Sequence, residues 1–409
     1  MNIFRKKCLL QDLDQLIFYA IASLAFFLAL MPFMASLSLG IGFFLYIIKI
    51  IASGKNRSFR RTMFDLPIAA FTLISGLSVA VSPDPAFSFY NYYNLVGRYV
   101  LTYLLVVQNV TTLRQIQQIV YALGASALLV VLYGFHQYIF GIDISAMKWV
   151  DGEAFPELKT RVFSTWENPN ILAGYLDVVM SVVFGLFCWL KERKTRLLLG
   201  GFFCLLAICL SMTYARGACL SMALVIAGYG LLKDRRILLG CIALAAVILA
   251  VQPALADRLA SVFSGMDTSS EMRLAFWEST IAMILDHPLL GIGWGAYWMV
   301  YPVYDFYIND VSIKIVHAHN MYLNFAAEIG IAGCLSFMAF FFGLLWKGIS
   351  AGNLRESRFL NGLLLGCGLA LLSIALNGIT DYVLFNIESS MLFWLLGALM
   401  VLSFEEYAG

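Results

Sequence analysis

The sequence predicts an all-α, polytopic integral membrane protein with about twelve transmembrane helices. Apolar residues make up 61% of its 409 residues and charged residues 13%, whereas a soluble domain has roughly 25% charged residues. The apolar residues also occur in runs of the length that crosses a bilayer, about 17 to 25 residues. A helix is the expected form of such runs, because it satisfies its backbone hydrogen bonds internally.

Twelve apolar runs justify the helix count. They lie near residues 15–34, 36–52, 66–82, 95–109, 116–140, 169–190, 197–213, 217–232, 237–252, 320–346, 359–376 and 389–405. The first run is longer than a signal-peptide core and lacks a small-residue cleavage site, so we expect it to remain as a span. The chain then divides into nine N-terminal spans (1–252), a long outer loop with an amphipathic helix (253–318) and three C-terminal spans (319–409).

The basic residues predict the orientation, because Lys and Arg accumulate in short cytoplasmic loops. With the N-terminus inside, the N-terminal segment and alternate loops hold eighteen of the 27 basic residues. Both termini are then cytoplasmic. The connections 83–94, 141–168, 253–318 and 377–388 lie outside.

Other global features point to no further chemistry. The net charge of +2 gives no indication of nucleic-acid binding. None of the eight cysteines forms a Cys-x-x-Cys pair, and seven lie in apolar runs, so we expect small hydrophobic residues rather than a disulfide framework or a metal site.

Two arginines fall at the predicted outer surface before the long loop. Arg161 lies near the end of the 141–168 connection, ahead of Asn168-Pro169-Asn170, where an asparagine is expected to cap the next span. Arg216 follows a hairpin with almost no loop, so it lies near the depth where lipid begins. Arginine is seldom placed there without a use, although snorkelling to the interface is the alternative.

The long outer loop contains a predicted interfacial helix over 269–286. Its larger apolar residues fall broadly on one side, and Trp277 is expected to anchor it in the interface: Met272, Phe276, Ile281, Ile284 and Leu285. Arg273 is a neighbour of Trp277 on this helix. The following Gly291-Ile-Gly-Trp-Gly295 permits a turn that could approach a ligand closely, but it lies outside the strand–turn–helix unit of nucleotide-binding loops.

The stretch from His317 to Asn320 opens the next hydrophobic helix with two of the four histidines in the chain. A structural helix start is the simplest interpretation. Beside arginines that suit a phosphate or diphosphate, a histidine also suits proton transfer near neutral pH. Zinc binding by His-x-His is disfavoured, because no carboxylate or cysteine with ligand spacing accompanies it. We therefore expect no metal and no cofactor.

These residues resemble the O-antigen ligase and polymerase family. The similarity lies in Arg216-Gly217, in Arg273 followed by Trp277, in His287-Pro-Leu-Leu-Gly-Ile-Gly293 and in His319-Asn-Met-Tyr-Leu with Glu328-Ile-Gly-Ile-Ala-Gly333. Asn168-Pro-Asn-Ile-Leu-Ala-Gly174 also resembles a segment of many members. The match covers roughly the second half of the chain, and the first five spans match only in hydropathy.

The resemblance implies a metal-independent membrane glycosyltransferase of the C-type class, with its active site facing the periplasm from the bacterial inner membrane. The donor would be a glycan on undecaprenyl diphosphate. The acceptor would be the lipid A core for a ligase, another lipid-linked glycan for a polymerase, or a protein Ser or Thr for an oligosaccharyltransferase. By similarity, His319 would activate the acceptor hydroxyl, while Arg216 and Arg273 would bind the diphosphate. Weaker candidates for substrate contact are Arg161, His317 and Asn320.

Two acids have no role at this point. Glu328 lies nine residues into the helix that His319 opens, about 13 Å deeper, and needs a partner such as an arginine. Asp381 is interpreted as a solvated loop residue. The competing class is a transporter or flippase of lipid-linked glycans, which fits twelve spans, but the chain shows no internal repeat and its candidate groups gather at one surface.

Overall fold

The computed structural model describes residues 3–54, 59–141, 161–260, 268–306, 314–350 and 357–405. Within these residues the regular structure is helical and no strand occurs. The all-α prediction is therefore confirmed.

Sixteen α-helices and four short 3₁₀ or π segments make up the described chain. In order they are α1 (Ile3–Phe27), α2 (Pro32–Ser53), α3 (Asp65–Ser78), η2 (Val79–Val81), α4 (Pro85–Asn94), η3 (Leu95–Val100), α5 (Leu101–Asn109), α6 (Leu113–Phe140), α7 (Pro169–Trp189), α8 (Arg193–Ser211), α9 (Arg216–Leu232), α10 (Arg235–Val251), α11 (Pro253–Ala260), α12 (Thr268–Asp286), α13 (Tyr297–Val300), η6 (Tyr301–Val303), α14 (Met321–Ser350), α15 (Arg358–Asn377), η7 (Val383–Phe385) and α16 (Ile387–Glu405).

Eight of the described helices are long and apolar enough to cross a membrane: α1, α2, α6, α7, α8, α14, α15 and α16. The other predicted runs are also helical but shorter. They correspond to α3 with η2, to η3 with α5, to α9 and to α10. The polytopic membrane class is confirmed, and the count of twelve spans stays a prediction.

The core of the bundle is built on α7, α15 and α16, whose residues are mostly buried. Helices α7 and α15 approach closely because small residues face each other. A side chain at Gly185 would collide with the backbone of Gly362 and Gly366. Small residues at such crossings let apolar helices gain contact where lipid gives little hydrophobic driving force.

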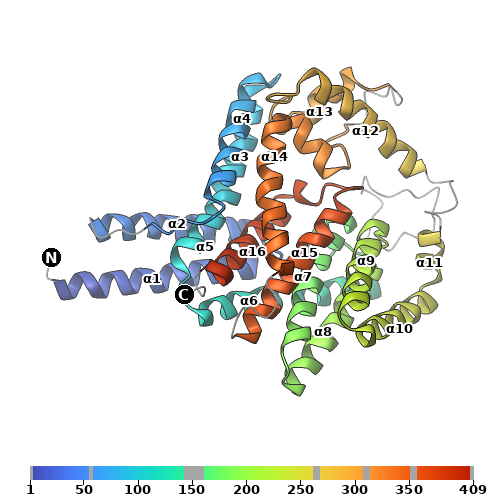
Figure 1. The fold of residues 1–409 in the computed structure, drawn as a ribbon, viewed down its shortest axis with the longest axis horizontal. Coiled ribbons are helices and arrows are strands. Elements are labelled where there is room, and N and C mark those ends of the chain that lie inside the picture. The colour runs from blue at the N-terminus through green and yellow to red at the C-terminus, as the bar shows by residue number, and fades with distance from the viewer. Residues whose placement is uncertain are drawn as a thin grey trace.

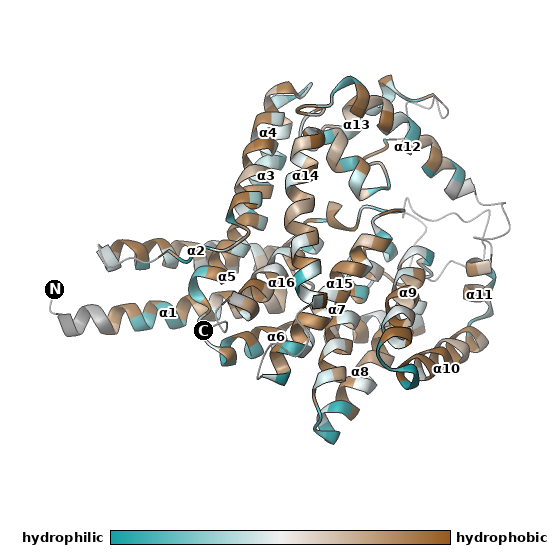
Figure 2. Ribbon diagram, in the orientation of Figure 1, coloured by the Kyte–Doolittle hydropathy of each residue, from teal (hydrophilic) through white to brown (hydrophobic). Residues whose placement is uncertain are grey.

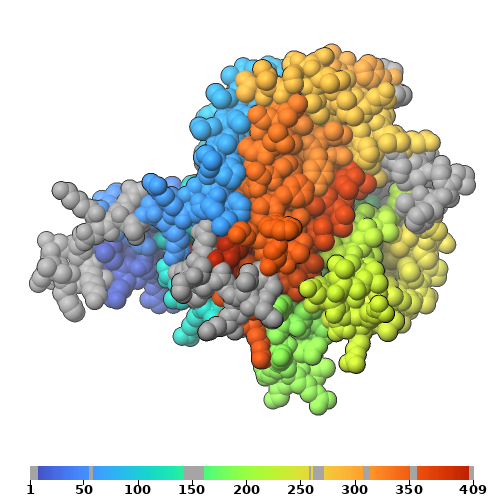
Figure 3. Space-filling model, viewed as in Figure 1, coloured from blue at the N-terminus to red at the C-terminus, as the bar shows by residue number. Residues whose placement is uncertain are grey.

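The bundle has two chemically different ends. The turn between α7 and α8, with Lys191, Arg193 and Lys194, lies at the bottom of Figure 1, and α12 with α13 lies at the opposite end. Figure 2 shows the lower tip of α8 as hydrophilic beneath apolar helix bodies. In Figure 3 the gold segments of α12 and α13 cover the upper end of the orange α14, while the α1–α2 hairpin projects to one side. The histidine stretch, at the start of α14, therefore comes from a different part of the bundle than the basic α7–α8 turn.

Residues 85–94 form helix α4, so the prediction of a loop over 83–94 was wrong, while its position on the outer side stays a prediction. Asp84 caps α4 by accepting hydrogen bonds from the backbone N–H groups of Ala86 and Phe87, and Pro85 occupies the first helical position. Asp-Pro starts a helix readily, because the carboxylate satisfies orphan donors and proline needs none. Through the π segment η3, α4 continues into α5.

The glycine turn after α12 packs against the chain itself. Helix α14 is interrupted at Gly330, where φ is 72°. The interruption frees the carbonyls of Ala327 and Glu328, which accept hydrogen bonds from the N–H groups of Ile292 (2.9 Å) and Gly293 (3.1 Å). Any side chain at Gly291 would collide with this backbone. The glycines permit this turn to pack closely against the backbone of α14, while the predicted approach to a ligand stays a prediction.

Helix α12 packs on the protein through Phe276, Ser279, Thr280 and Met283, which are buried, whereas Met272, Ile281 and Leu285 are exposed. Its position at the membrane interface stays a prediction. Thr280 is buried because its hydroxyl lies 2.7 Å from that of Tyr297 and donates to, or accepts from, it.

Candidate active site

The predicted site is organised by the start of α14. Asn320 is its cap: its Oδ1 accepts hydrogen bonds from the N–H groups of Tyr322 and Leu323, each at 3.0 Å. Its Nδ2 donates to the Ile379 carbonyl at 3.0 Å, and the Met321 N–H donates to Gly378. Asn320 therefore ties the histidine segment to the loop after α15, which gives it a structural role beside the expected substrate contact.

His319 has a strained backbone. Its φ is 48°, in the left-handed region that non-glycine residues seldom adopt. Neighbours hold it there: its N–H donates to Nδ1 of His317 at 3.2 Å, and its carbonyl accepts from Trp277 Nε1 at 3.4 Å. Such strain costs of order 1–3 kcal/mol and is concentrated at functional sites. Trp277 was expected to anchor α12 in the interface; it holds the histidine backbone.

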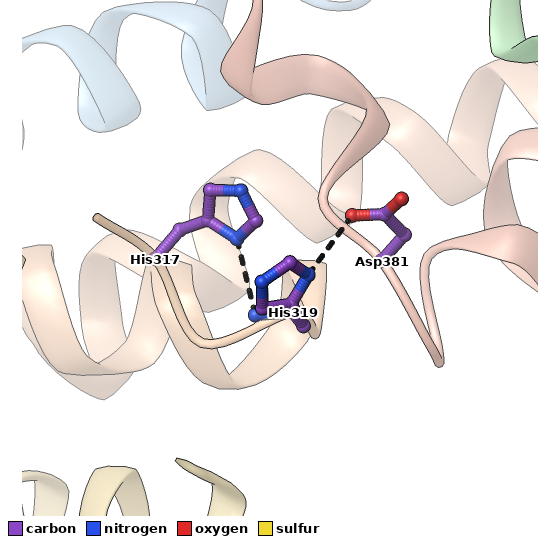
Figure 4. Close-up of side chains that lie close together, drawn as sticks. All are labelled: His317, His319 and Asp381. Atoms are coloured by element: carbon purple, nitrogen blue, oxygen red, sulfur yellow. Dashed lines mark hydrogen bonds and ion pairs between the residues drawn. The ribbon is translucent and has the colours of Figure 1, made fainter. Parts of the chain in front are cut away.

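Asp381 faces the imidazole of His319. Its Oδ1 lies 3.4 Å from His319 Nδ1, as Figure 4 shows. The same oxygen accepts a hydrogen bond from the N–H of Tyr382 at 2.8 Å, so the carboxylate is fixed in place. At 3.4 Å the His319 and Asp381 side chains form an ion-pair contact and not a hydrogen bond, because His319 Nδ1 has no hydrogen-bond partner among the described residues. The interpretation of Asp381 as a solvated loop residue was wrong, because the turn after α15 folds back onto the start of α14.

The electrostatic environment determines the protonation states of His317 and Asp381. Burial, reinforced by His319 and Arg273, lowers the pKa of His317 to about 3 against the opposing effect of Asp381. His317 is therefore neutral near pH 7, which suits the acceptor role of its Nδ1. Burial alone raises the pKa of Asp381, but its interactions with His319 and His317 outweigh burial and lower that pKa to about 2. Asp381 is therefore an anion.

This anion selects the tautomer of His319. A carboxylate can only accept, so the proton of the neutral imidazole belongs on Nδ1, facing Asp381. The lone pair is then on Nε2. That arrangement of base and orienting carboxylate is the one that prepares a histidine to remove a proton from a hydroxyl.

Helix α12 brings Arg273 to the histidines. The Phe276 ring stacks on His319, with centroids 5.7 Å apart and planes 22° apart. Arg273 precedes Phe276 by about one turn, and its charge acts on His317. Helix α12, which carries Arg273, and the histidine segment before α14 thus lie next to each other.

Arg216 begins α9 beside the loop that carries Asp381. The neighbouring Gly217 packs so closely on Asn377 and Thr380 that a side chain there would contact both. The preceding Tyr214 has a φ of 55°, a second strained residue near the site. The positive end of the α9 dipole adds to the charge of Arg216 and favours an anion at this position.

Arg161 is largely enclosed, with 8% of its surface exposed. Its Nε donates to the Thr213 carbonyl at 2.9 Å, and one terminal nitrogen donates to Asn170 Oδ1 at 2.8 Å. It therefore clamps the turn before Arg216 to the start of α7. Asn168 caps α7 by accepting from the N–H of Asn170, as expected for one of the two asparagines.

Glu328 finds backbone partners rather than the expected arginine. Its buried carboxyl accepts hydrogen bonds from the N–H groups of Gly295 and Tyr297. Spacing along the chain did not point to these partners, because they belong to the glycine turn that the Gly330 interruption brings alongside.

The same cluster offers ligand atoms for a metal. One ligand atom each from His317, His319 and Asp381 lies within 4.8 Å of the others. Two histidines and a carboxylate are a common set for zinc or iron. The argument that no carboxylate accompanies His-x-His was therefore wrong, because Asp381 is distant in sequence and adjacent in space.

Comparison with known proteins finds a match to one family model. The family model described as O-antigen ligase matches residues 201–338. No curated protein matches the chain. The matched segment includes Arg216, Arg273 and both histidines, which confirms the resemblance found in the motifs, and it ends before Asp381.

Proposed function

We propose that this chain, whose residues 201–338 match the family model described as O-antigen ligase, transfers a glycan from undecaprenyl diphosphate to an acceptor hydroxyl. The family match supports glycan transfer of the ligase or polymerase type in general. The observation that carries the finer proposal is the contact of His319 Nδ1 with Asp381, which leaves Nε2 as a base beside two arginine-bearing helices.

His319 acts on the acceptor in this proposal. Its Nε2 accepts the hydroxyl proton while the acceptor oxygen forms a bond to the anomeric carbon of the donor. The bond from that carbon to the phosphate oxygen breaks, and the diphosphate departs with the electron pair. Asp381 stabilises the imidazolium that results. General-base catalysis of this kind contributes about 10²–10⁴-fold.

Arg216 and Arg273 act on the leaving group. A diphosphate gains negative charge at the bridging oxygen as the bond breaks, and fixed guanidinium groups stabilise it without reorganising. Arginine also binds phosphate oxygens through two parallel hydrogen bonds. Arg216 begins α9, and Arg273 lies in α12 close enough to His317 to affect its charge, so in this proposal the two arginines hold the two phosphates.

The orientation follows the same proposal. We propose a bacterial inner-membrane protein with both termini in the cytoplasm and the site facing the periplasm. The charge pattern supports it, because the basic α7–α8 turn lies at the end of the bundle away from α12. Membrane lipids would then surround the spans.

The acceptor is best assigned as the lipid A core, which makes the chain an O-antigen ligase; polymerase and protein oligosaccharyltransferase activities are the alternatives. The test is to reconstitute the full chain with a glycan on undecaprenyl diphosphate. Lipid A core, a second lipid-linked glycan and a pilin-like protein are offered in separate vesicles. Sugar gained by the lipid A core supports the ligase. Donor movement across the bilayer with no new glycosidic bond would instead establish a transporter.

Metal-independent action is part of the proposal and is tested separately, since the histidine–carboxylate cluster has a metal-like donor set. A bound metal would have to compete with the His319–Asp381 contact and use Nε2 of His317, whose Nδ1 is engaged. Transfer is expected to survive dialysis against a chelator. Loss of transfer that Zn²⁺ or Mn²⁺ restores would replace the base mechanism with a metal centre.

A further inference from the structure

A cavity of about 430 Å³ lies beside the histidine cluster and is not used by the mechanism above. It is enclosed by residues from η3, the glycine turn, α14 and the start of α16. Its size falls within the roughly 300–1,000 Å³ of small-molecule sites. The cavity is therefore large enough to take part of a substrate.

The cavity shares a wall with the reaction site. Tyr382 and Phe385 line it, and the ring of Phe385 lies 4.8 Å from that of His317. Tyr382 also donates its N–H to Asp381. A molecule in the cavity is thus separated from the proposed base only by the segment 381–385.

The lining mixes aromatic faces with polar acceptors. Trp294, Trp394 and Phe325 contribute apolar surface from rings that are otherwise buried in the core, and the asparagines and glutamates contribute oxygens. Asn94 is 7% exposed, and its amide nitrogen donates to the Tyr90 carbonyl. Asn94 therefore presents a polar side chain in the lining. Apolar ring surface combined with amide and carboxylate oxygens is complementary to a sugar ring and its hydroxyls.

Acidic residues line the cavity without a basic one. Glu167, Glu328 and Glu388 line it, and among the described residues no Lys or Arg does. Glu328 is held by backbone N–H groups and Glu167 also has a partner, so Glu388 is the lining carboxylate that no hydrogen bond or ion pair within the described chain occupies. An anionic group would be repelled here and an amine attracted. The diphosphate therefore does not belong in this cavity.

We infer that this cavity is a carbohydrate subsite that binds a neutral or amine-bearing sugar residue and rejects uronic or phosphorylated sugars. The inference rests on the proposed glycan transfer, because that activity explains why a sugar should lie next to His319. The sugar can belong to the donor or to the acceptor, and both present the same hydroxyl and amine chemistry.

Binding is tested on the full chain in detergent, without any donor, by ligand-observed NMR. The probes are the disaccharides of glucosamine, N-acetylglucosamine and galacturonic acid. The first two are expected to bind at least roughly tenfold more tightly than the third, because hydrogen bonds to a charged group are worth that factor or more. Glu388→Gln is expected to remove most of the preference for glucosamine. Glu192→Gln, at the α7–α8 turn, keeps its contact with Thr195 and is the matched control that should leave the preference unchanged.

Asn94→Leu is expected to weaken binding of all three sugars. Because this substitution of a buried residue can also disturb folding, the Glu388→Gln result decides whether the cavity is a sugar subsite. Equal binding of the galacturonate probe, or an unchanged preference in Glu388→Gln, would overturn the subsite. His319→Ala should bind the probes normally, so a failure of transfer with binding intact counts against the proposed function and not against the cavity.

Kinetics of the reconstituted reaction distinguish whether the bound sugar belongs to the donor or to the acceptor. If Glu388→Gln raises KM only for the acceptor, the cavity holds the acceptor sugar. If it raises KM only for the lipid-linked donor, the cavity holds the donor sugar. No change in either KM contradicts a subsite for this reaction.

Discussion

The two sides of the 381–385 segment differ in charge. On one side lie His319, Arg216 and Arg273, a basic face that includes the start of α9 and the middle of α12. On the other lies the cavity lined by Glu167, Glu328 and Glu388 together with aromatic rings. One short loop thus separates a surface suited to a diphosphate from a space suited to an uncharged or amine-bearing sugar. The bond to be broken in the donor joins those two kinds of group.

Glycan transfer depends most on the proposed general base, so His319→Ala has the largest expected effect. Transfer should fall by about 10²–10⁴-fold, since the variant lacks the group that removes the acceptor proton. Product formation in the reconstituted assay measures it. His136→Ala, at an exposed position of α6, is the control and should retain full activity. If His319→Ala stays fully active, proton removal by this residue is not part of the mechanism.

Substitution of the two arginines is expected to have the second-largest effect on transfer. Arg216→Ala and Arg273→Ala should each reduce transfer about 10²–10³-fold, which is the effect of removing one stabilising group from a developing oxyanion. Lysine at either position should rescue only partly, because it offers one point charge in place of a planar fork. Arg193→Ala, in the exposed α7–α8 turn, controls for loss of positive charge. Full rescue by lysine would indicate that only net charge matters.

Removing the orienting carboxylate should cost less than removing the base. Asp381→Asn is expected to lower the turnover number about 10–100-fold, which is the loss caused by removing the carboxylate partner of a metal-bound histidine. The KM for donor should change little, because Asp381 contacts the histidine and not the diphosphate. Asp257→Asn, an exposed acid of α11, serves as the control. A rise in donor KM with unchanged turnover would assign Asp381 to substrate binding.

The smallest effect concerns stability. The pKa of His317 is about 3 in the folded protein, below the roughly 6.5 of an exposed histidine. As pH falls below 6.5 the unfolded chain binds a proton at this residue before the folded chain does, so folding stability is lost toward acid pH. In His317→Asn, whose side-chain oxygen can still accept from the His319 N–H, Tm should fall less steeply between pH 6.5 and 4. Parallel Tm curves for the two proteins would show that His317 does not contribute.

Local hydropathy and charge predicted the scaffold well. Every apolar run is helical in the structure, because an apolar segment in a membrane must form its hydrogen bonds within itself. The prediction failed at 83–94, where a polar and aromatic composition suggested a loop. Asp84 and Pro85 start a helix there, and the exposed Phe89, Tyr90 and Tyr93 are consistent with an aromatic belt.

The sequence by itself determined the membrane class, the helical segments and the interest in Arg216, Arg273 and His319, because composition and short motifs are local properties of the chain. Only the tertiary structure decided the partner of His319. Asp381 belongs to another helix end, and no spacing rule links it to the histidine. The same holds for the packing of the Gly291–Gly295 turn against the interruption at Gly330, which supplies the partners of Glu328. Contacts between distant segments depend on how helices cross and where they break, and a single sequence does not encode these in any local pattern.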